Sequence, residues 1–206
     1  MTRTLDNLQM DGGCLVFNFV NTVNTRKPAP EFDYLDTFED LLAWSAKAES
    51  LGGAKLQALR EYAAQKPEAA SEELHDMIEA REMLYELFSA IAKGTQPGAA
   101  VIDAFNHRLS MAFQKIHVKF GSAGAEIHLG GEGISLDEPL LPVLKSAFDI
   151  LTRKDLGRIK ECPRCGWLFL DTSKNGKRKW CDMNVCGSRE KSLEYYYRKT
   201  KARHNA

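Results

Sequence analysis

Four cysteines near the C-terminus have the spacing of a metal site. Cys162 and Cys165 form a Cys-X-X-Cys pair followed by Gly166, and Cys181 and Cys186 supply a second pair after 15 intervening residues. Two close pairs separated by a loop let a short chain surround one tetrahedral ion, with each sulfur at about 2.3 Å. Four protein ligands leave no open position for water, which a catalytic zinc requires. The sequence therefore predicts one structural Zn²⁺ ion at these four cysteines.

The redox environment expected for the chain supports metal ligation over disulfides. The longest early apolar stretch, residues 14–20, contains Asn18, follows an acidic start and is far shorter than the ~20 residues that span a bilayer. We therefore expect no signal peptide, no membrane contact and a cytoplasmic location. In a reducing cytosol, clustered cysteines are more often metal ligands than disulfides.

Charge is distributed unevenly along a chain whose formal net charge is zero. Residues 152–206 carry 15 Lys and Arg against 6 Asp and Glu, a net charge of +9, which leaves −9 for residues 1–151. A basic segment of this kind suggests a polyanionic partner. The basic segment could instead attract the acidic part of the same chain. Some of its residues, such as Arg164, could also offset the formal charge of −2 of a zinc ion bound by four thiolates.

The basic residues themselves are candidates for binding nucleic acid. Cations spaced along a surface neutralise phosphates and release counterions, so affinity for DNA would fall steeply with salt. A basic last helix could enter a major groove, or it could dock on an acidic protein surface instead. The alternative function is therefore a zinc-stabilised protein-interaction module without nucleic-acid binding. The candidate residues are Lys174, Lys177, Arg178, Lys179, Arg189, Lys191, Arg198 and Lys199.

The elements around the cysteines predict a treble-clef-like finger. Residues 167–170 favour a strand, Asn175-Gly176 is typical of a tight type I′ turn, and residues 177–180 are expected to return as the second strand of a hairpin. Ser188 is expected to cap a final helix over residues 189–203.

The sequence predicts two domains. Residues 1–155 are expected to form a mainly helical N-terminal domain, and residues 156–206 are expected to form the finger. Helices are expected from Thr37 to the Gly52-Gly53 pair, over 54–65, from Ser71 to Gly94, over 98–114 and over 138–160. Residues 116–129 alternate as a β-hairpin with its turn at 121–124, and a third strand is expected at 134–136. Residues 10–26 fit a short buried helix or a strand. The predicted fold class is mainly α with a small β-hairpin (α+β).

Polar residues beside the first apolar run are candidates for a ligand pocket. Asn18, Asn21, Thr22 and Arg26 could bind a small-molecule effector, although such side chains more often bond nearby backbone. Cys14, inside the apolar run, is interpreted as a core thiol. The sequence contains no Ser/His/Asp arrangement, phosphate-binding glycine loop or paired catalytic carboxylates, so we do not expect an enzyme.

Two stretches resemble known families. The finger sequence CPRCGWLFLDTSKNGKRKWCDMNVCGSREK, residues 162–191, resembles the CGNR zinc finger, and LVFNFVNT, residues 15–22, resembles the start of the ABATE domain that normally precedes it. The resemblance implies a stress-induced transcription regulator that binds DNA, with an N-terminal domain that senses an effector or forms a homodimer. Ser188 replaces the asparagine of the family signature, and Asn18 replaces its usual aspartate. Serine keeps the capping chemistry but cannot make the two-point adenine contact of asparagine.

Overall fold

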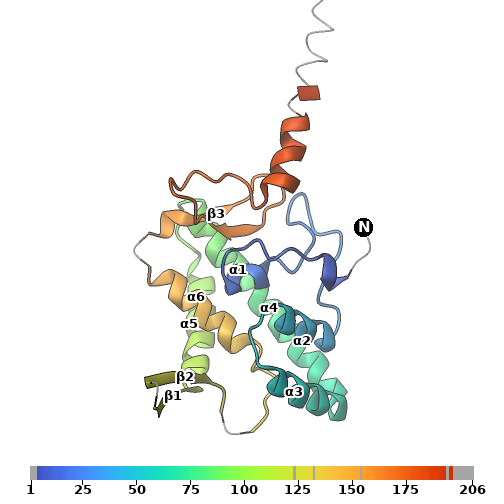
Figure 1. Cartoon of the computed structure of the whole chain (residues 1–206), viewed down its shortest axis with the longest axis vertical. Helices are drawn as coiled ribbons and strands as arrows, with labels where there is room; N and C mark the ends of the chain where they lie inside the picture. Colours follow the sequence, from blue (N-terminus) through green and yellow to red (C-terminus); the bar gives the residue numbers. More distant parts are fainter. Residues whose placement is uncertain (1–3, 123, 132, 154, 194, 197–206) are drawn as a thin grey trace, which may run out of the picture.

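A computed structural model describes residues 4–122, 124–131, 133–153, 155–193 and 195–196 of the chain. In these residues a helical body surrounds the long helix α4, the β1–β2 hairpin lies near its lower end, and the β3–β4 hairpin lies at its upper end, below the last helical residues (Figure 1). The α-helices are α1 (Leu15–Val20), α2 (Phe38–Lys47), α3 (Gly53–Gln65), α4 (Pro67–Ala92), α5 (Ala99–Phe113) and α6 (Leu140–Leu151). The strands are β1 (Ile116–Gly121), β2 (Gly124–Leu129), β3 (Ile159–Glu161) and β4 (Leu168–Leu170). Shorter turns are η1 (Leu5–Asn7), η2 (Leu156–Arg158) and the π-helix η3 (Met183–Gly187). The predicted fold class, mainly helical with a small hairpin and a cysteine-rich finger, is confirmed.

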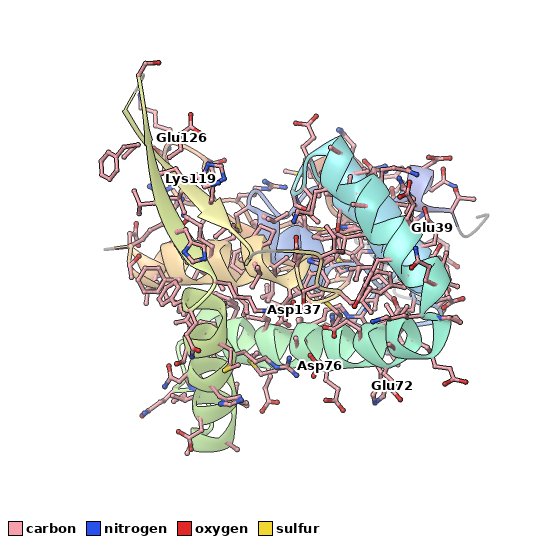
Figure 2. The ribbon with its side chains drawn as sticks, turned by 90° about the horizontal axis from the view of Figure 1, so that it is seen from below. Glu39, Glu72, Asp76, Lys119, Glu126 and Asp137 are labelled. Atoms are coloured by element: carbon pink, nitrogen blue, oxygen red, sulfur yellow. The ribbon has the colours of Figure 1, made fainter. Side chains whose placement is uncertain are left out.

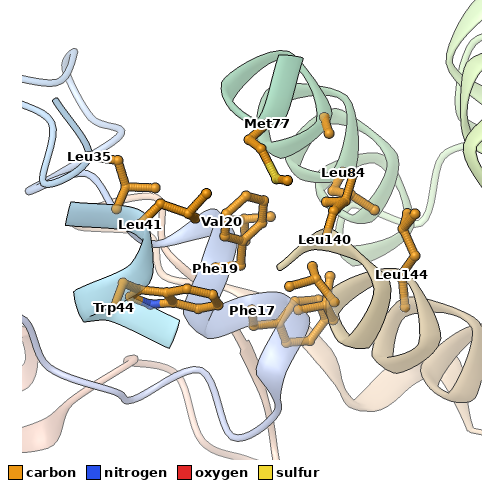
Figure 3. Packing of buried hydrophobic residues seen from close by; sticks show 14 of the residues in the cluster. Phe17, Phe19, Val20, Leu35, Leu41, Trp44, Met77, Leu84, Leu140 and Leu144 are labelled. Atoms are coloured by element: carbon orange, nitrogen blue, oxygen red, sulfur yellow. The ribbon is translucent and has the colours of Figure 1, made fainter. Parts of the chain in front are cut away.

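Helix α1 is the centre of the hydrophobic core. The segment that fitted either a helix or a strand is a helix of six residues, and four of them are buried. Phe17 meets Phe88 of α4 edge to face at 5.1 Å between ring centroids, and Phe19 packs at 5.2 Å against Trp44 of α2. Figure 3 shows α1 between α2 on one side and α4 and α6 on the other. Because α1 is covered on all these sides, its sequence carries no polar face and no clear periodicity.

The helix ends follow local capping rules, with one correction. Thr37 and Asp40 form the capping box expected at the start of α2, and Gly94, at φ +71°, follows the end of α4. The prediction that Ser71 begins α4 is wrong. Pro67 occupies the first turn instead, where its fixed φ suits a helix and its missing N–H costs nothing.

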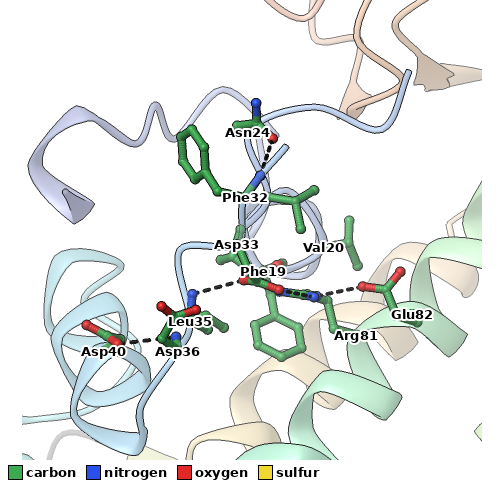
Figure 4. A network of polar contacts seen from close by, with 12 residues as sticks. Phe19, Val20, Asn24, Phe32, Asp33, Leu35, Asp36, Asp40, Arg81 and Glu82 are labelled. Atoms are coloured by element: carbon green, nitrogen blue, oxygen red, sulfur yellow. Dashed lines mark hydrogen bonds and ion pairs between the residues drawn. The ribbon is translucent and has the colours of Figure 1, made fainter. Parts of the chain in front are cut away.

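A buried arginine ties the loop after α1 to α4 (Figure 4). Arg81 is 3% exposed and donates from Nη1 and Nη2 to the two carboxylate oxygens of Asp33, at 2.8 and 2.6 Å. Its Nε donates to Glu82 at 2.8 Å. Burial opposes ionisation of this guanidinium, but the adjacent carboxylates outweigh that effect and raise the pKa of Arg81. The loop is thereby held against the long helix.

Three further strand and helix expectations are wrong. The predicted helix 138–160 ends at Leu151, and residues 159–161 form β3, which pairs antiparallel with β4. The predicted return strand at 177–180 does not form, because the buried carboxylate of Asp171 binds the loop instead. Its Oδ1 accepts from Ser173 N at 3.0 Å and its Oδ2 from Arg178 N at 2.9 Å. The expected strand at 134–136 is also absent from the described residues there, where Ser135 N donates to Glu138 Oε1.

The finger is attached to the body by the chain around α1. The side-chain amide of Asn21 pairs with the backbone of Leu168 in β4, donating to its carbonyl at 2.8 Å and accepting from its N–H at 3.0 Å. Leu170 N donates to Gly12 O at 2.9 Å, and Trp167 Nε1 donates to Val23 O at 2.9 Å. The edge of β4 that β3 leaves open is therefore paired by the N-terminal segment. Buried residues of the finger join the same hydrophobic cluster as the helices.

We expect Asn21→Ala to weaken the whole fold. Asn21 is 1% exposed, and its loss leaves a buried N–H and a buried C=O without partners, so the free energy of unfolding should fall by about 2 to 4 kcal/mol. Urea denaturation of the metal-loaded protein measures this. Asn106→Ala, which removes an exposed amide from α5, is the matched control and should change stability by less than about 0.5 kcal/mol. Equal destabilisation of the two variants would contradict this role of Asn21.

Candidate metal centre and adjoining basic surface

The structure brings the four predicted cysteines together. Their sulfur atoms all lie within 4.8 Å of one another, with 3.4 Å between Cys165 and Cys181 and 3.6 Å between Cys181 and Cys186. A tetrahedral ion with four bonds of about 2.3 Å requires sulfurs about 3.8 Å apart. A disulfide would need about 2.05 Å. The donor set and its spacing therefore fit a four-coordinate thiophilic metal.

The first cysteine pair lies on the turn between β3 and β4. Gly166 N donates to Cys162 O, and Cys162 N donates to Trp167 O, each at 2.8 Å. Gly166 has φ +75°, and a Cβ atom there would come within 2.8 Å of the Cβ of Arg26. Both the backbone conformation and the close approach of the N-terminal segment require glycine at this position. The knuckle is thus shaped by its own turn and by the segment packed on it.

The second pair is placed by a short π-helix. Cys181 precedes η3, and Cys186 lies within it with its N–H donating to Asp182 O at 3.0 Å. Asp182 caps the turn by accepting from Val185 N at 2.7 Å. The expectation that Ser188 is the cap is therefore wrong: Ser188 lies after the turn, and its hydroxyl donates to Asn184 O. Ser188, which replaces the asparagine of the family signature, thus has a local structural role.

The four thiols are close enough to affect one another's protonation. Hydrogen bonds from the neighbouring thiols lower the pKa of Cys162, whereas hydrogen bonding to Cys162 raises that of Cys165 and of Cys181. The protons are thus divided among coupled sulfurs. A divalent ion at the centre would remove this competition, because it favours the thiolate at every position. Cys14 lies outside the cluster, and burial raises its pKa to about 11, as befits a core thiol.

The predicted basic residues occupy different environments beside the centre. Arg178 is partly buried, donates from Nε to Trp180 O at 2.8 Å and stacks 4.8 Å from the Phe169 ring. Lys179 lies 4.7 Å over the Trp180 ring. Lys179 is exposed, and so are Lys174, Lys177, Arg189 and Lys191. Arg198, Lys199 and all of the predicted helix 189–203 beyond residue 196 lie outside the described residues.

A small hollow joins the knuckle to the last described helical turns. It has a volume of about 380 Å³, and Arg164 approaches it from the first cysteine pair, while Arg189 approaches from the helical residues 188–193. Arg164 has one ion pair among the described residues, a long contact of 3.4 Å to Glu190. The sequence suggests only that Arg164 offsets the negative charge of a zinc–thiolate site, since nothing in the spacing indicates that it lines the same hollow as Arg189. The other lining residues are Ser188, Ser192 and Leu193.

The candidate ligand pocket residues are engaged inside the fold. Asn21 binds β4 as described, and Asn18 Oδ1 accepts from Gly12 N at 2.9 Å. Thr22 Oγ1 donates to Phe19 O at 2.8 Å. Arg26 donates from Nη2 to Val20 O at 2.6 Å and stacks 4.0 Å from the Tyr85 ring. These contacts attach α1 and the following loop to their surroundings.

A second cavity lies between α4, α5 and α6, in a region that the sequence did not single out. Its volume is about 430 Å³, with three leucines of α6 on one side and the Asp76–Arg108 ion pair on the other. Asp76 of α4 and Asp137, from the segment before α6, both line this cavity (Figure 2). Burial, reinforced by these two carboxylates, raises the pKa of nearby Glu73 to about 7. Because the residues come from three separate elements, no local pattern could have predicted the cavity.

Comparison with known families accounts for nearly the whole chain. Residues 13–154 match the ABATE domain, described as "Putative stress-induced transcription regulator", and residues 158–199 match the CGNR zinc finger. Both resemblances drawn from the sequence are confirmed. The comparison with curated proteins finds no match. Within the described residues, no helix is long and apolar enough to cross a membrane.

We expect Glu73 to make stability fall as pH rises. Its folded pKa, about 7, is above its ordinary value of 4.5, so the proton stabilises the folded state below about pH 4.5 and this contribution is lost as pH rises through 7. At pH 8, Glu73→Gln should therefore raise the free energy of unfolding by about 1 kcal/mol after solvent screening, which corresponds to a rise in Tm of about 2 to 4 °C. At pH 5 the rise in Tm should be much smaller. Thermal melts at both values, with exposed Glu72→Gln as control, test this. A Glu73 effect independent of pH would refute it.

Proposed function

The chain belongs to the ABATE family, and on that premise we propose that it is a transcription regulator that binds DNA through its C-terminal finger. The observation that carries the proposal is the hollow beside the metal centre, where Arg164 and Arg189 approach from two elements. Two guanidinium groups around a recess of this size suit a backbone phosphate, because each presents several N–H donors to its oxygens. The hollow therefore supplies a contact that fixes the finger on a duplex.

One Zn²⁺ ion holds this surface together. Thiolates favour zinc among the common divalent ions of the cytoplasm, and four of them complete its tetrahedral coordination. The ion would fix the knuckle, which carries Arg164, relative to the turn that precedes Arg189. Zinc thus has a structural role here, and no catalytic step is part of the proposal.

The surrounding cations provide the remaining attraction for DNA. Lys174, Lys177 and Lys191 are exposed, and residues 152–206 carry a net charge of +9. Arg178 and Lys179 contribute positive charge while they pack on Phe169 and Trp180. Contacts of this kind bind phosphate without reading bases, so we propose that they give general affinity and that the end of the chain, with Arg198 and Lys199, adds to it.

The ABATE domain is proposed to control this activity in the cytoplasm. It would sense a small effector, through the segment of Asn18, Asn21, Thr22 and Arg26 or in the cavity between α4, α5 and α6, or it would associate with a second copy. The segment is a direct route to the finger, because Arg26 N donates to Cys165 O and Asn21 binds Leu168. A shift of α1 would therefore displace the knuckle.

The zinc assignment predicts one tightly held ion per chain. Elemental analysis of the purified protein should give one zinc, and Cys162→Ser/Cys165→Ser should give none. Because the knuckle packs on the N-terminal segment, removal of zinc by a chelator should also lower Tm of the whole protein. Cys14→Ser, which removes a thiol outside the cluster, should keep the full zinc content. A metal-free protein with unchanged Tm would contradict this role of the ion.

DNA binding is tested by a pair of charge-matched variants. Fluorescence anisotropy with labelled duplex fragments across a salt series should give a steep log-log slope for the wild type. Arg164→Gln/Arg189→Gln should reduce that slope by about 2, nearly one unit for each phosphate that is no longer bound. Arg60→Gln/Lys119→Gln removes two charges from α3 and β1, at the opposite end of the molecule from the finger (Figure 1), and should leave the slope unchanged.

The anisotropy measurement, followed by capture of a partner from lysate, separates the two candidate functions. If the folded protein holds one zinc and binds no duplex even at low salt, the DNA proposal fails. The finger would then be a protein-interaction module, and the basic surface should retain an acidic partner from nuclease-treated lysate in the wild type but not in Arg164→Gln/Arg189→Gln.

A further inference from the structure

The β1–β2 hairpin has one polar face and one apolar face. Its register pairs Ile116 with Leu129, Val118 with Ile127 and Phe120 with Ala125. Cross-strand partners lie on the same face of a sheet, so all six of these side chains share one face. The opposite face carries His117 paired with His128 and Lys119 paired with Glu126. The hairpin is therefore amphipathic over its full length.

The apolar face is not covered by the described part of the chain. Phe120 is 84% exposed, Ile127 is 57% exposed and Val118 is 55% exposed, and only the base of the hairpin, at Leu129, packs against the core. Figure 2 shows the two strands projecting from the body, with Lys119 and Glu126 far from the helices. A two-stranded hairpin is marginally stable by itself in water. This hairpin therefore needs a partner for its apolar face.

The exposed apolar area near the hairpin is large enough for an interface. Phe113 ends α5 just before β1, stacks edge to face on Phe148 at 5.0 Å, and both rings remain more than one-third exposed. At about 150 to 250 Å² per aromatic side chain, the exposed parts of the residues named below present on the order of 500 Å². Two such surfaces give roughly 1,000 Å², the least that a specific interface buries. The residues are Phe113, Val118, Phe120, Ile127 and Phe148.

We infer that this apolar face packs against the same face of a second copy of the chain, in a two-fold homodimer. The chemistry of the face favours that occupant. The charged pair of the hairpin, Lys119 with Glu126, lies on the opposite face, so two apolar faces can meet without burying a charge. Pairing of strand edges alone would leave Phe120 and Ile127 in water, so the contact must be face to face. A two-fold axis lets one patch cover its own copy and closes the assembly at two chains.

This inference deepens the self-association role within the proposed function, and it is tested without DNA. Val118→Thr/Phe120→Thr/Ile127→Thr makes the apolar face polar and keeps residues that favour strands. The matched control, His117→Thr/Lys119→Thr/His128→Thr, places three threonines on the opposite face of the same strands. Sedimentation equilibrium of the zinc-loaded full chain from about 1 to 100 μM should show a dimer for the wild type and the control. The apolar-face variant should have a dimer dissociation constant at least about 100-fold higher.

Circular dichroism and zinc content establish that each variant is folded before the comparison. A wild type that stays monomeric at about 100 μM overturns the inference, as does a dimer that all three proteins form equally. If the monomeric wild type instead cosediments with phosphatidylcholine–phosphatidylglycerol vesicles and the apolar-face variant does not, the face binds lipid and the homodimer is refuted. Because no duplex is present, these outcomes are independent of whether the finger binds DNA.

Discussion

The pairing of one buried amide with one strand determines how the two halves of this molecule meet. β4 has only three residues and β3 covers one of its edges, so the other edge would present buried N–H and C=O groups without partners. Asn21 satisfies both groups of Leu168, and Gly12 O accepts from Leu170 N. An unpaired buried peptide group costs about 1 to 3 kcal/mol, so the finger is held where the N-terminal segment places it. The geometry of the four-cysteine centre and the position of the segment after α1 are therefore coupled.

This attachment has a mechanical consequence for the metal centre. The carbonyl of Cys165 accepts from Arg26 N at 2.6 Å and from Thr25 Oγ1 at 3.2 Å, while Tyr85 of α4 donates to Gly166 O at 3.2 Å. The knuckle thus lies between its own sulfur ligands and three residues of the ABATE domain. Close-packed elements transmit displacement because they have no space to absorb it. A ligand that moves α1 by a fraction of an ångström would act on the knuckle directly, and through it on Arg164.

Features set by neighbours in sequence were predictable, and features set by distant partners were not. Cysteine spacing predicted the metal site, alternation predicted β1 and β2, and Thr37 with Asp40 predicted the start of α2, since each depends on residues close in the chain. The strand expected at 177–180 does not form because buried Asp171 binds the loop there. The cap before the last helical segment is Asp182, at the start of η3, and not Ser188. The partner of Asn21 lies 147 residues away, so its structural role could not be separated from a pocket role by sequence. That Arg164 and Arg189 line one hollow depends in the same way on the folded knuckle.

The arrangement of the two exposed surfaces limits how they can influence each other. The finger and the β1–β2 hairpin lie at opposite ends of the molecule, so a partner on one does not block the other (Figure 1). Any influence between them must pass through the helices. α4 contacts both β3 and α5, and α5 leads directly into β1. The cavity between α4, α5 and α6 lies on this path, with the carboxyl of Glu73 nearby at a pKa of about 7. An effector there would alter helix packing between the two surfaces and could act on each of them without touching either.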